Sequence, residues 1–241
     1  MAGKNKKKPG FASALILAAG SGTRFGGTKQ FTEILGVPVI LRTALAFEKC
    51  PLIDEIIVVT GEDDIERCHV ILDGRITKLT HVIMGGSTRQ RSAMAGLELV
   101  DERCEYVAIH DAARCLVTPE IIENVMNEAY KTGAAAAAEK AVDTVKIADK
   151  DGNIVETVDR DKVWLMKTPQ IFLANMYRAG VYSAYRDVVT VTDDCGLVER
   201  IGFKIKAVDC GHENIKITYP TDKIVAEAII KSRVRRGELE E

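Results

Sequence analysis

A glycine-rich loop with two basic side chains follows the first apolar run of the sequence. The run ends at Ala19 and Gly20, and Arg24 and Lys29 follow within the loop. Small residues let backbone N–H groups approach phosphate oxygens, and the two cations add positive charge. The pattern favours a phosphate-binding loop over the alternative, a tight turn between a strand and a helix with two solvated basic side chains.

Two common phosphate-binding loops are excluded by the spacing. A dinucleotide fingerprint needs a third glycine where Phe25 stands, and a Walker loop needs a lysine where Thr28 stands. The missing fingerprint also disfavours an NAD-dependent reductase. The loop still has the parts that a phosphate site of another class needs.

Further motifs follow the loop in a fixed order. They are AAGSGTRFGGTKQ (18–30), GGSTRQRSA (85–93), HDAAR (110–114), TVDR (157–160), TPQ (168–170), TDD (192–194) and NIKIT (214–218). Together they resemble the motifs of the 2-C-methyl-D-erythritol 4-phosphate cytidylyltransferase family, within the sugar-phosphate nucleotidylyltransferase superfamily, over residues 12–232. The resemblance implies transfer of a cytidylyl group from CTP to 2-C-methyl-D-erythritol 4-phosphate. The products would be 4-diphosphocytidyl-2-C-methyl-D-erythritol and pyrophosphate, in the non-mevalonate pathway to isoprenoid precursors.

The resemblance implies catalytic roles for Arg24, Lys29 and Lys216. Arg24 and Lys29 would hold the triphosphate, and Lys216 would reach the phosphates from another side. The nucleophile is already a phosphate, so charge neutralisation and positioning carry the reaction and no general base is needed. The pattern around Lys216 predicts a strand, with Ile215 and Ile217 turned inward.

The resemblance also implies two sets of binding residues. Small residues would let backbone groups read the cytosine edge, and this nucleotide-binding set is Ala18, Ala19, Gly20, Gly22, Gly86 and Ser92. The set expected to bind the acceptor polyol phosphate is Asp111, Arg114, Thr144, Arg160, Thr168 and Thr192. Asp111 is also the expected protein ligand of Mg²⁺, which would be carried mainly by the triphosphate. The neighbouring His110 is expected to be structural.

Two positions depart from the family pattern. Cys115 follows HDAAR where proline is usual, which predicts a looser turn and a thiol near the site. Lys167 precedes TPQ where an uncharged residue is commoner. Neither departure removes a group that the chemistry needs.

Short apolar runs alternate with helical patterns through the first part of the chain. Strands are predicted at 13–19, 55–60, 81–85, 106–111 and 133–138, and helices at 38–50, 63–73, 88–99 and 118–131. Later helices are predicted at 174–186, 193–201 and 220–233, and a strand at 204–209. This order predicts one α/β domain over 1–241, a Rossmann-like, mostly parallel sheet flanked by helices. Such sheets bind ligands beyond the carboxyl ends of their strands.

A projecting β-hairpin arm is predicted at 139–165, around the turn sequence DKDGN. A bare hairpin is only marginally stable and its β-branched residues need a cover, which predicts a homodimer built on interlocked arms. Thr144 and Arg160 lie on this arm, so each acceptor site would be shared between two chains.

Composition narrows the class of protein. The 241 residues carry a net charge of −2, which gives no support for nucleic-acid binding. The six cysteines form no C-x-x-C pair and no stretch is long enough to span a membrane, which favours a cytoplasmic protein with reduced thiols. Residues 1–11 are expected to be a basic disordered tail rather than a signal peptide. Two alternatives stay open, a ribitol 5-phosphate cytidylyltransferase and a non-catalytic nucleotide-binding module.

Overall fold

The computed structural model describes residues 8–20 and 22–239. Most of the tail expected at 1–11 therefore lies outside the described residues, and its last residue, Phe11, already begins a strand. The strands of the main sheet, in chain order, are β1 (Phe11–Leu17), β4 (Glu55–Thr60), β5 (Leu79–Met84), β6 (Cys104–Asp111), β7 (Ala134–Lys140), β10 (Trp164–Leu173) and β11 (Lys206–Asp209).

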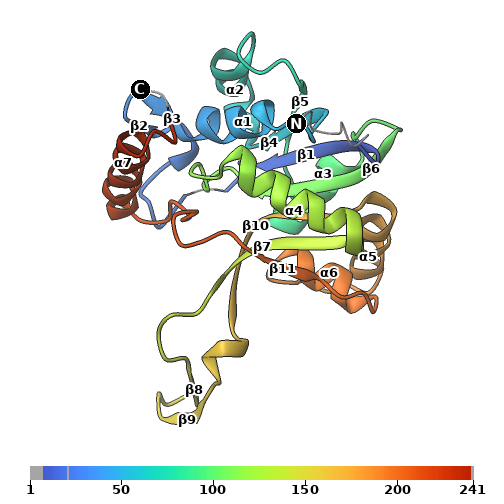
Figure 1. Ribbon diagram of the computed structural model, residues 1–241. Coiled ribbons are helices and arrows are strands. Elements are labelled where there is room, and N and C mark those ends of the chain that lie inside the picture. Colours follow the sequence, from blue (N-terminus) through green and yellow to red (C-terminus); the bar gives the residue numbers. More distant parts are fainter. Residues whose placement is uncertain (1–7, 21, 240–241) are drawn as a thin grey trace, which may run out of the picture.

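Within this part of the chain the seven strands pair in the order β11-β7-β10-β6-β1-β4-β5 (Figure 1). The pairs β1–β4, β1–β6, β4–β5 and β7–β11 are parallel, which confirms the mostly parallel sheet. Only β10 runs antiparallel, between β6 and β7. Its first residues therefore lie at the same edge of the sheet as the carboxyl ends of β6 and β7.

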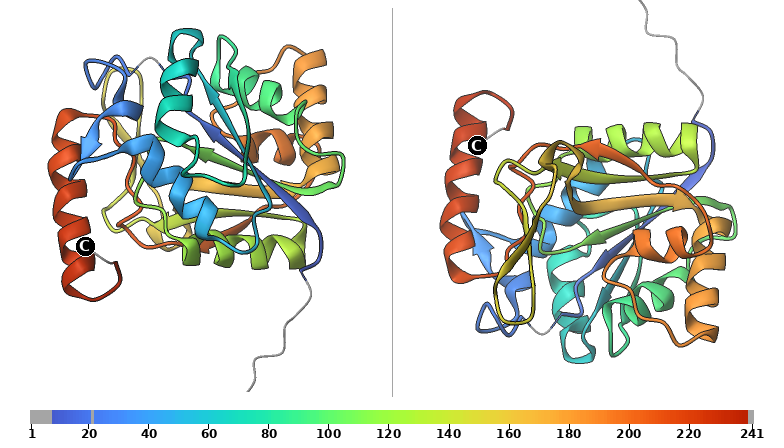
Figure 2. Two further views of the ribbon diagram at one scale, coloured as in Figure 1. Left: turned by 90° about the horizontal axis from the view of Figure 1, so that it is seen from above. Right: turned by 90° about the horizontal axis from the view of Figure 1, so that it is seen from below.

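Helices cover both faces of the sheet because its central strands are apolar on both sides (Figure 2). One face packs on α1 (Val39–Lys49), α2 (Ile65–Leu72) and α4 (Pro119–Thr132), through a core that includes Phe47 and Met126. The other face packs on α3 (Arg89–Leu97), α5 (Ala174–Arg186) and α6 (Asp194–Arg200), through a core that includes Leu97 and Tyr177.

The helix boundaries follow local capping signals. The Thr118 hydroxyl accepts a hydrogen bond from the Ile121 N–H at the start of α4, and Pro119 takes the first helical position. Gly133 ends α4 with a φ of 80°, a conformation that favours glycine. The predicted helix at 118–131 is thus confirmed to within a residue at each end.

A third, smaller cluster lies beside the main sheet. It joins α7 (Pro220–Arg235) to the short hairpin of β2 (Glu33–Ile34) and β3 (Val37–Pro38), which the sequence patterns did not predict. Ala226 and Ile230 of α7 pack with Ile34, Cys115 and Ile217. The described residues also include three single-turn 3₁₀ helices, at Lys29–Phe31, Glu62–Asp64 and Arg160–Lys162.

The predicted arm is present. Strands β8 (Lys146–Ala148) and β9 (Ile154–Thr157) pair antiparallel, and Figure 1 shows them at the tip of a segment that projects from the sheet. Val142, Ile154 and Val155 on this arm are 60–75% exposed in the single chain. In the single chain these apolar side chains are therefore left uncovered.

One predicted strand is wrong. Residues 214–218 form no strand, and the segment runs as an irregular loop from the end of β11 to α7. It is held by side chains and by an isolated backbone hydrogen bond, from the Ile217 N–H to the Ala113 carbonyl at 2.8 Å. None of the described helices has the length and apolar character that crossing a membrane requires.

Candidate active site

A cavity of about 470 Å³ opens at the carboxyl ends of β1 and β6. This is the edge at which parallel α/β sheets bind ligands. The structure brings most of the predicted site residues to its lining, namely Ala18, Ala19, Gly20, Gly22, Arg24, Lys29, Gly86, Ser92, Asp111 and Lys216. Residues far apart in the sequence thus meet in one site.

The glycine loop turns tightly around Gly22, which has a φ of 64°. The Phe25 and Gly26 N–H groups both donate to the Gly22 carbonyl, at 2.8 and 3.0 Å. A Cβ on Gly22 would lie 1.9 Å from the Gly27 carbonyl oxygen, so only glycine allows this turn. The turn sets the start of the 3₁₀ helix that carries Lys29 beside the cavity.

Positive charge is concentrated in the cavity. Burial lowers the pKa of Lys29 below its usual range, and the charges of Lys216 and Arg24 lower it further, against the opposing effect of Asp111. The neighbouring cations therefore add to the cost of keeping Lys29 charged. A bound polyanion would reverse this effect, so the arrangement suits a triphosphate.

The other wall of the cavity is closely packed. A Cβ on Gly85 would lie 2.7 Å from the Ala19 Cβ and 2.7 Å from the Ser92 Oγ. The Ser92 hydroxyl is held by the carbonyls of Thr88 and Gly86, at 3.0 and 3.3 Å. This wall of the cavity is therefore formed by backbone and small side chains.

Asp111 ends β6 and is 8% exposed. Arg89 Nε donates to its Oδ1 at 2.9 Å, and Lys216 Nζ donates to its Oδ2 at 2.6 Å. Burial alone would raise the pKa of this carboxyl, but Arg89 and Lys216 outweigh burial and hold it well below its usual range. Asp111 is therefore a carboxylate at neutral pH and ties two cations to the end of the strand.

The structure adds an arginine that sequence reasoning missed. Arg89, at the start of α3, also donates from Nη1 to the Asp194 Oδ2 at 2.5 Å. Asp194 is 1% exposed and accepts a second hydrogen bond from the Tyr177 hydroxyl at 2.7 Å. Although burial disfavours the charged guanidinium, Asp194 and Asp111 raise the pKa of Arg89. Arg89 lies in the motif at 85–93 and Asp194 in the motif at 192–194, but nothing in the sequence indicates that these two side chains form an ion pair.

A layer of buried polar groups supports Asp111 from below. The Thr168 Oγ1 accepts a hydrogen bond from the Asp111 N–H and lies 3.1 Å from the His110 Nδ1. His110 is fully buried, and burial lowers its pKa to about 3, so the ring is neutral. This confirms the structural role expected of His110.

Arg114 lies in the same layer. Its Nη1 donates to the Asn214 carbonyl at 3.0 Å, and the Asn214 Nδ2 donates to the Thr168 carbonyl at 3.0 Å. Among the described residues, the buried Arg114 Nε and Asn214 Oδ1 have no hydrogen-bond partner. Arg114 is thus held in this layer with one of its donors unused.

Five predicted residues do not line the cavity of their own chain, namely Arg114, Thr144, Arg160, Thr168 and Thr192, the first and fourth of which lie in the layer beneath it. Thr144 and Arg160 lie on the arm, where the Arg160 Nη1 donates to the Val142 carbonyl at 2.8 Å. Thr192 is exposed, just before α6. A single chain does not assemble the whole predicted set of acceptor residues.

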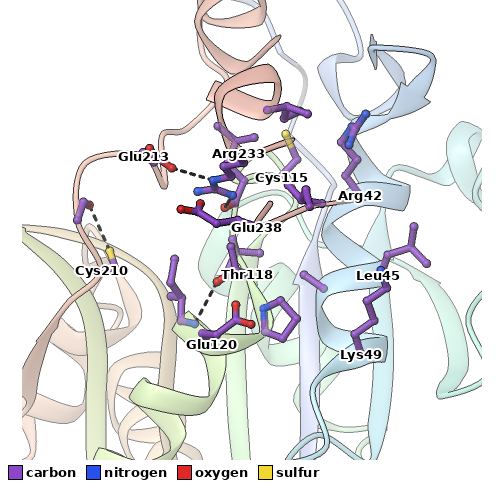
Figure 3. Close-up of a pocket in the computed structure, with 18 of the residues that line it drawn as sticks. Arg42, Leu45, Lys49, Cys115, Thr118, Glu120, Cys210, Glu213, Arg233 and Glu238 are labelled. Carbon is purple, nitrogen blue, oxygen red and sulfur yellow. Dashed lines mark hydrogen bonds and ion pairs between the residues drawn. The ribbon is translucent and has the colours of Figure 1, made fainter. Parts of the chain in front are cut away.

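Cys115 also lies elsewhere, so the expectation of a thiol near the site is wrong. It lines a second cavity of about 950 Å³, between α1, the start of α4 and the end of α7 (Figure 3). Burial raises the pKa of Cys115 to about 12, which makes the thiol unreactive. The turn after Arg114 is therefore held by the packing of the Cys115 side chain in the third cluster and not by a proline ring.

Comparison with known proteins identifies the family. The family model of 2-C-methyl-D-erythritol 4-phosphate cytidylyltransferase matches residues 12–232. A protein of this name from Symbiobacterium thermophilum is 39% identical over 226 residues, which cover 93% of this chain and 94% of the relative. Another, from Caldanaerobacter subterraneus subsp. tengcongensis, is 41% identical and the match covers 91% of this chain and 98% of the relative.

Solved structures agree. The crystal structure of 4-diphosphocytidyl-2C-methyl-D-erythritol synthase from Anaerococcus prevotii superposes with a TM-score of 0.84 at 34% identity, covering 92% of this chain and 96% of that one. The motifs, the cavity and these matches cover the same span of the chain. The chain belongs to the 2-C-methyl-D-erythritol 4-phosphate cytidylyltransferase family and is a nucleotidyltransferase that transfers a cytidylyl group from CTP to 2-C-methyl-D-erythritol 4-phosphate in isoprenoid biosynthesis.

Proposed function

We propose that the cavity at the ends of β1 and β6 is the site of this transfer, with Arg24, Lys29 and Lys216 as its catalytic residues. The observation that carries the proposal is the gathering of cations around one cavity, where burial lowers the pKa of Lys29 most and the charges of Lys216 and Arg24 lower it further. Of the described residues that line the cavity, Asp111 is the only carboxylate, and Arg89 and Lys216 already neutralise it. The cavity therefore has positive charge left for a polyanion.

The reaction follows from this charge. An oxygen of the acceptor phosphate attacks the α-phosphorus of CTP, the bond to the bridging oxygen breaks, and pyrophosphate leaves. Lys29 and Arg24 face the triphosphate from the glycine loop, and Lys216 faces it from the loop before α7. Each donor that stabilises charge in the transition state contributes about 3–4 kcal/mol. The attacking oxygen carries no proton to remove, so the neutral, buried His110 has no part in the chemistry.

We assign cytosine to the part of the cavity next to the glycine loop. Ala18, Ala19, Gly20, Gly86 and Ser92 line it, with Gly22 shaping the loop. The small side chains there leave backbone groups accessible to hydrogen-bond the edge of the base.

Mg²⁺ fits this site as a partner of CTP. No cluster of three or more histidine, cysteine or carboxylate side chains is positioned to hold a metal ion in the described part of the chain. Mg²⁺ commonly uses one or two carboxylates together with substrate phosphates, and Asp111 supplies one carboxylate at the cavity. When bound, the ion would neutralise phosphate charge alongside the three cations.

The acceptor site is proposed to be completed by a second chain. Asp111, Arg114, Thr168 and Thr192 would contribute from one chain, and Thr144 and Arg160 from the arm of the other. The support is twofold, since the arm exposes β-branched residues and its two polar residues lie off their own cavity. A two-fold pair is the commonest soluble assembly and satisfies both observations. We also propose that this dimer acts in the cytoplasm, without nucleic-acid or membrane partners.

The test is pyrophosphate release by the purified protein with Mg²⁺, CTP and one of two acceptors. We expect turnover with 2-C-methyl-D-erythritol 4-phosphate to exceed turnover with ribitol 5-phosphate by a wide margin. Faster turnover with ribitol 5-phosphate would reassign the acceptor site. CTP binding without pyrophosphate release from either acceptor would instead identify a non-catalytic nucleotide-binding module.

A further inference from the structure

The loop that carries Lys216 has no helix or strand to fix it. It leaves β11 after Asp209 and stays irregular until α7 begins at Pro220. A catalytic side chain on such a loop depends on the contacts that hold the backbone, because a displacement of about 1 Å at a reacting group costs up to about a hundredfold in rate. The contacts of this loop are therefore part of the site.

Lys167 makes the contacts at the start of this loop. Its Nζ lies 2.6 Å from the Glu139 Oε2 and donates to the carbonyls of Gly211 and His212, at 3.1 and 3.5 Å. An ammonium group has three N–H donors, and all three have acceptors here. The side chain is 8% exposed, so this charge is buried and depends on these partners.

An irregularity in the sheet directs Lys167 inward. The pairing of β10 with β7 shifts register between Met166 and Gln170. Between these two positions, Lys167, Thr168 and Pro169 of β10 lie opposite a single residue of β7, Ala137, so the regular alternation of sides is interrupted here. The bulge aims Lys167 at the Lys216 loop and aims Thr168 at the backbone of Asp111.

Other contacts hold the loop farther along. Glu213 pairs with Arg233 of α7 at 2.7 Å, as Figure 3 shows, and Asn214 is held by Arg114 and Thr168. The Lys167 contacts differ because they reach the loop from the root of the arm. Glu139 is next to the last residue of β7, where the chain leaves the sheet for the arm.

We propose that Lys167, paired with Glu139, is a positioning residue for Lys216. It fixes the loop carbonyls of Gly211 and His212 to the strands that carry the arm, and this places Lys216 against Asp111 and the phosphates. The inference rests on the catalytic role proposed for Lys216. Lys167 does not itself line the cavity, so we expect its substitution to lower kcat and not to weaken CTP binding.

The experiment compares Lys167→Met, Lys167→Arg and Lys78→Met by steady-state kinetics and thermal unfolding. We expect Lys167→Met to lower kcat by about tenfold or more, with KM for CTP within about twofold of wild type. Lys167→Arg keeps the charge and the donors and restores most of the rate. Lys78 is the matched control, because its Nζ also donates to backbone carbonyls, those of Glu48 and Cys50 at the end of α1, at 2.6 and 2.7 Å and away from the site. Lys78→Met is expected to lower the melting temperature and leave kcat unchanged.

A double mutant separates this inference from the role of Lys216. If Lys167 acts through Lys216, Lys167→Met causes no further loss of single-turnover rate in a Lys216→Ala background. Near wild-type kcat in folded Lys167→Met, or an undiminished effect in that background, would overturn the inference and leave the cytidylyl-transfer site in place. Wild-type rate in Lys216→Ala alone would instead remove the catalytic role of Lys216. Should Lys167→Met fail to fold, Glu139→Gln makes the same test, with kcat lowered severalfold expected and wild-type kcat overturning the proposal.

Discussion

Lys216 and Asp111 lie 105 residues apart in the sequence, and their side chains form an ion pair of 2.6 Å at the cavity. The pair joins the irregular loop before α7 to the end of a central strand. Asp111 holds Arg89 on its other oxygen at 2.9 Å, so one carboxylate fixes cations from two distant segments. Electrostatic preorganisation of this kind is the main source of catalysis when the nucleophile needs no base.

The first prediction concerns the cations. Lys29→Ala and Lys216→Ala are each expected to lower kcat by about a hundredfold or more, as expected for losing one donor to the transition state. Steady-state pyrophosphate release measures the effect. Lys223→Ala, which removes a half-exposed lysine from α7, is the control and should match wild type. A rate near wild type in either cavity mutant removes that residue from the mechanism.

The second prediction concerns Arg89. Arg89→Ala leaves Asp111 and the buried Asp194 without their shared cation, and we expect a loss of about 3–5 kcal/mol in the free energy of unfolding. Urea denaturation measures it. Arg89→Lys, which keeps a charge but reaches one carboxylate at a time, should recover part of the loss. Equal stability of Arg89→Ala and wild type would show that the two carboxylates do not need this arginine.

The third prediction concerns the base pocket. The Cβ of Gly85→Ala would lie 2.7 Å from both the Ala19 Cβ and the Ser92 Oγ, so these cavity residues must move. We expect KM for CTP to rise about tenfold, while kcat at saturating CTP changes little. Gly61→Ala is the control, because its Cβ would make only an ordinary contact of 3.5 Å with Asp64. Unchanged KM for CTP in Gly85→Ala would place the cytosine elsewhere.

The fourth prediction concerns the shared site. Arg160→Ala and Lys29→Ala are each expected to be inactive, but mixing the two variants should restore some activity. In a mixed dimer, one of the two sites has both residues intact. Activity of subunit-exchanged mixtures measures the effect, and mixing each variant with itself is the control. A monomer by light scattering, or no recovery despite proven exchange, excludes a site shared between chains.

The fifth prediction concerns acid stability. The pKa of His110 is about 3 in the folded chain, below the ordinary value of 6.5, so the unfolded chain binds the proton first as pH falls. The contribution of His110 to the free energy of unfolding is therefore fully present above about pH 6.5. Below that pH it declines by up to about 1.4 kcal/mol per pH unit. His110→Gln should therefore unfold with a shallower pH dependence between about 6.5 and 5 than wild type. His81→Gln, at an exposed histidine, is the control for removal of an imidazole. Equal slopes for wild type and His110→Gln would contradict the prediction.

The sequence predicts the sheet and its helices well because their burial is periodic. β1 and β6 are apolar runs with both faces covered, and α4 carries a proline at its start and a glycine at its end. The segment 214–218 misleads because Ile215 and Ile217 pack inward as they would in a strand. The segment differs from a strand in its backbone hydrogen bonding, because the Ile217 N–H donates to the Ala113 carbonyl in a loop and not to a neighbouring strand.

Site residues can be predicted from the sequence where they lie within one short motif. They cannot be predicted where the fold brings two distant motifs into contact. The glycine loop keeps its phosphate-binding parts within a few residues, so its cations are found from the sequence. Arg89 and Asp194 lie 105 residues apart, and their pairing depends on how α3 and α6 pack on one face of the sheet. The contact of Lys167 with Gly211 depends in the same way on a bulge that residue types alone do not reveal.

Because β10 runs antiparallel to β7, the sequence of the arm is constrained differently from the sequence of the core strands. β7 and β10 pair from Ala134 with Phe172 to Lys140 with Trp164, so the chain leaves the sheet and re-enters it at adjacent points. The core therefore tolerates changes in the length and composition of everything between those points. The cavity is built by the core, whereas the length of the arm can vary as long as Thr144 and Arg160 keep the positions proposed for them in the acceptor site. Insertions and deletions in relatives should accordingly gather between β7 and β10 rather than in the strands that build the cavity.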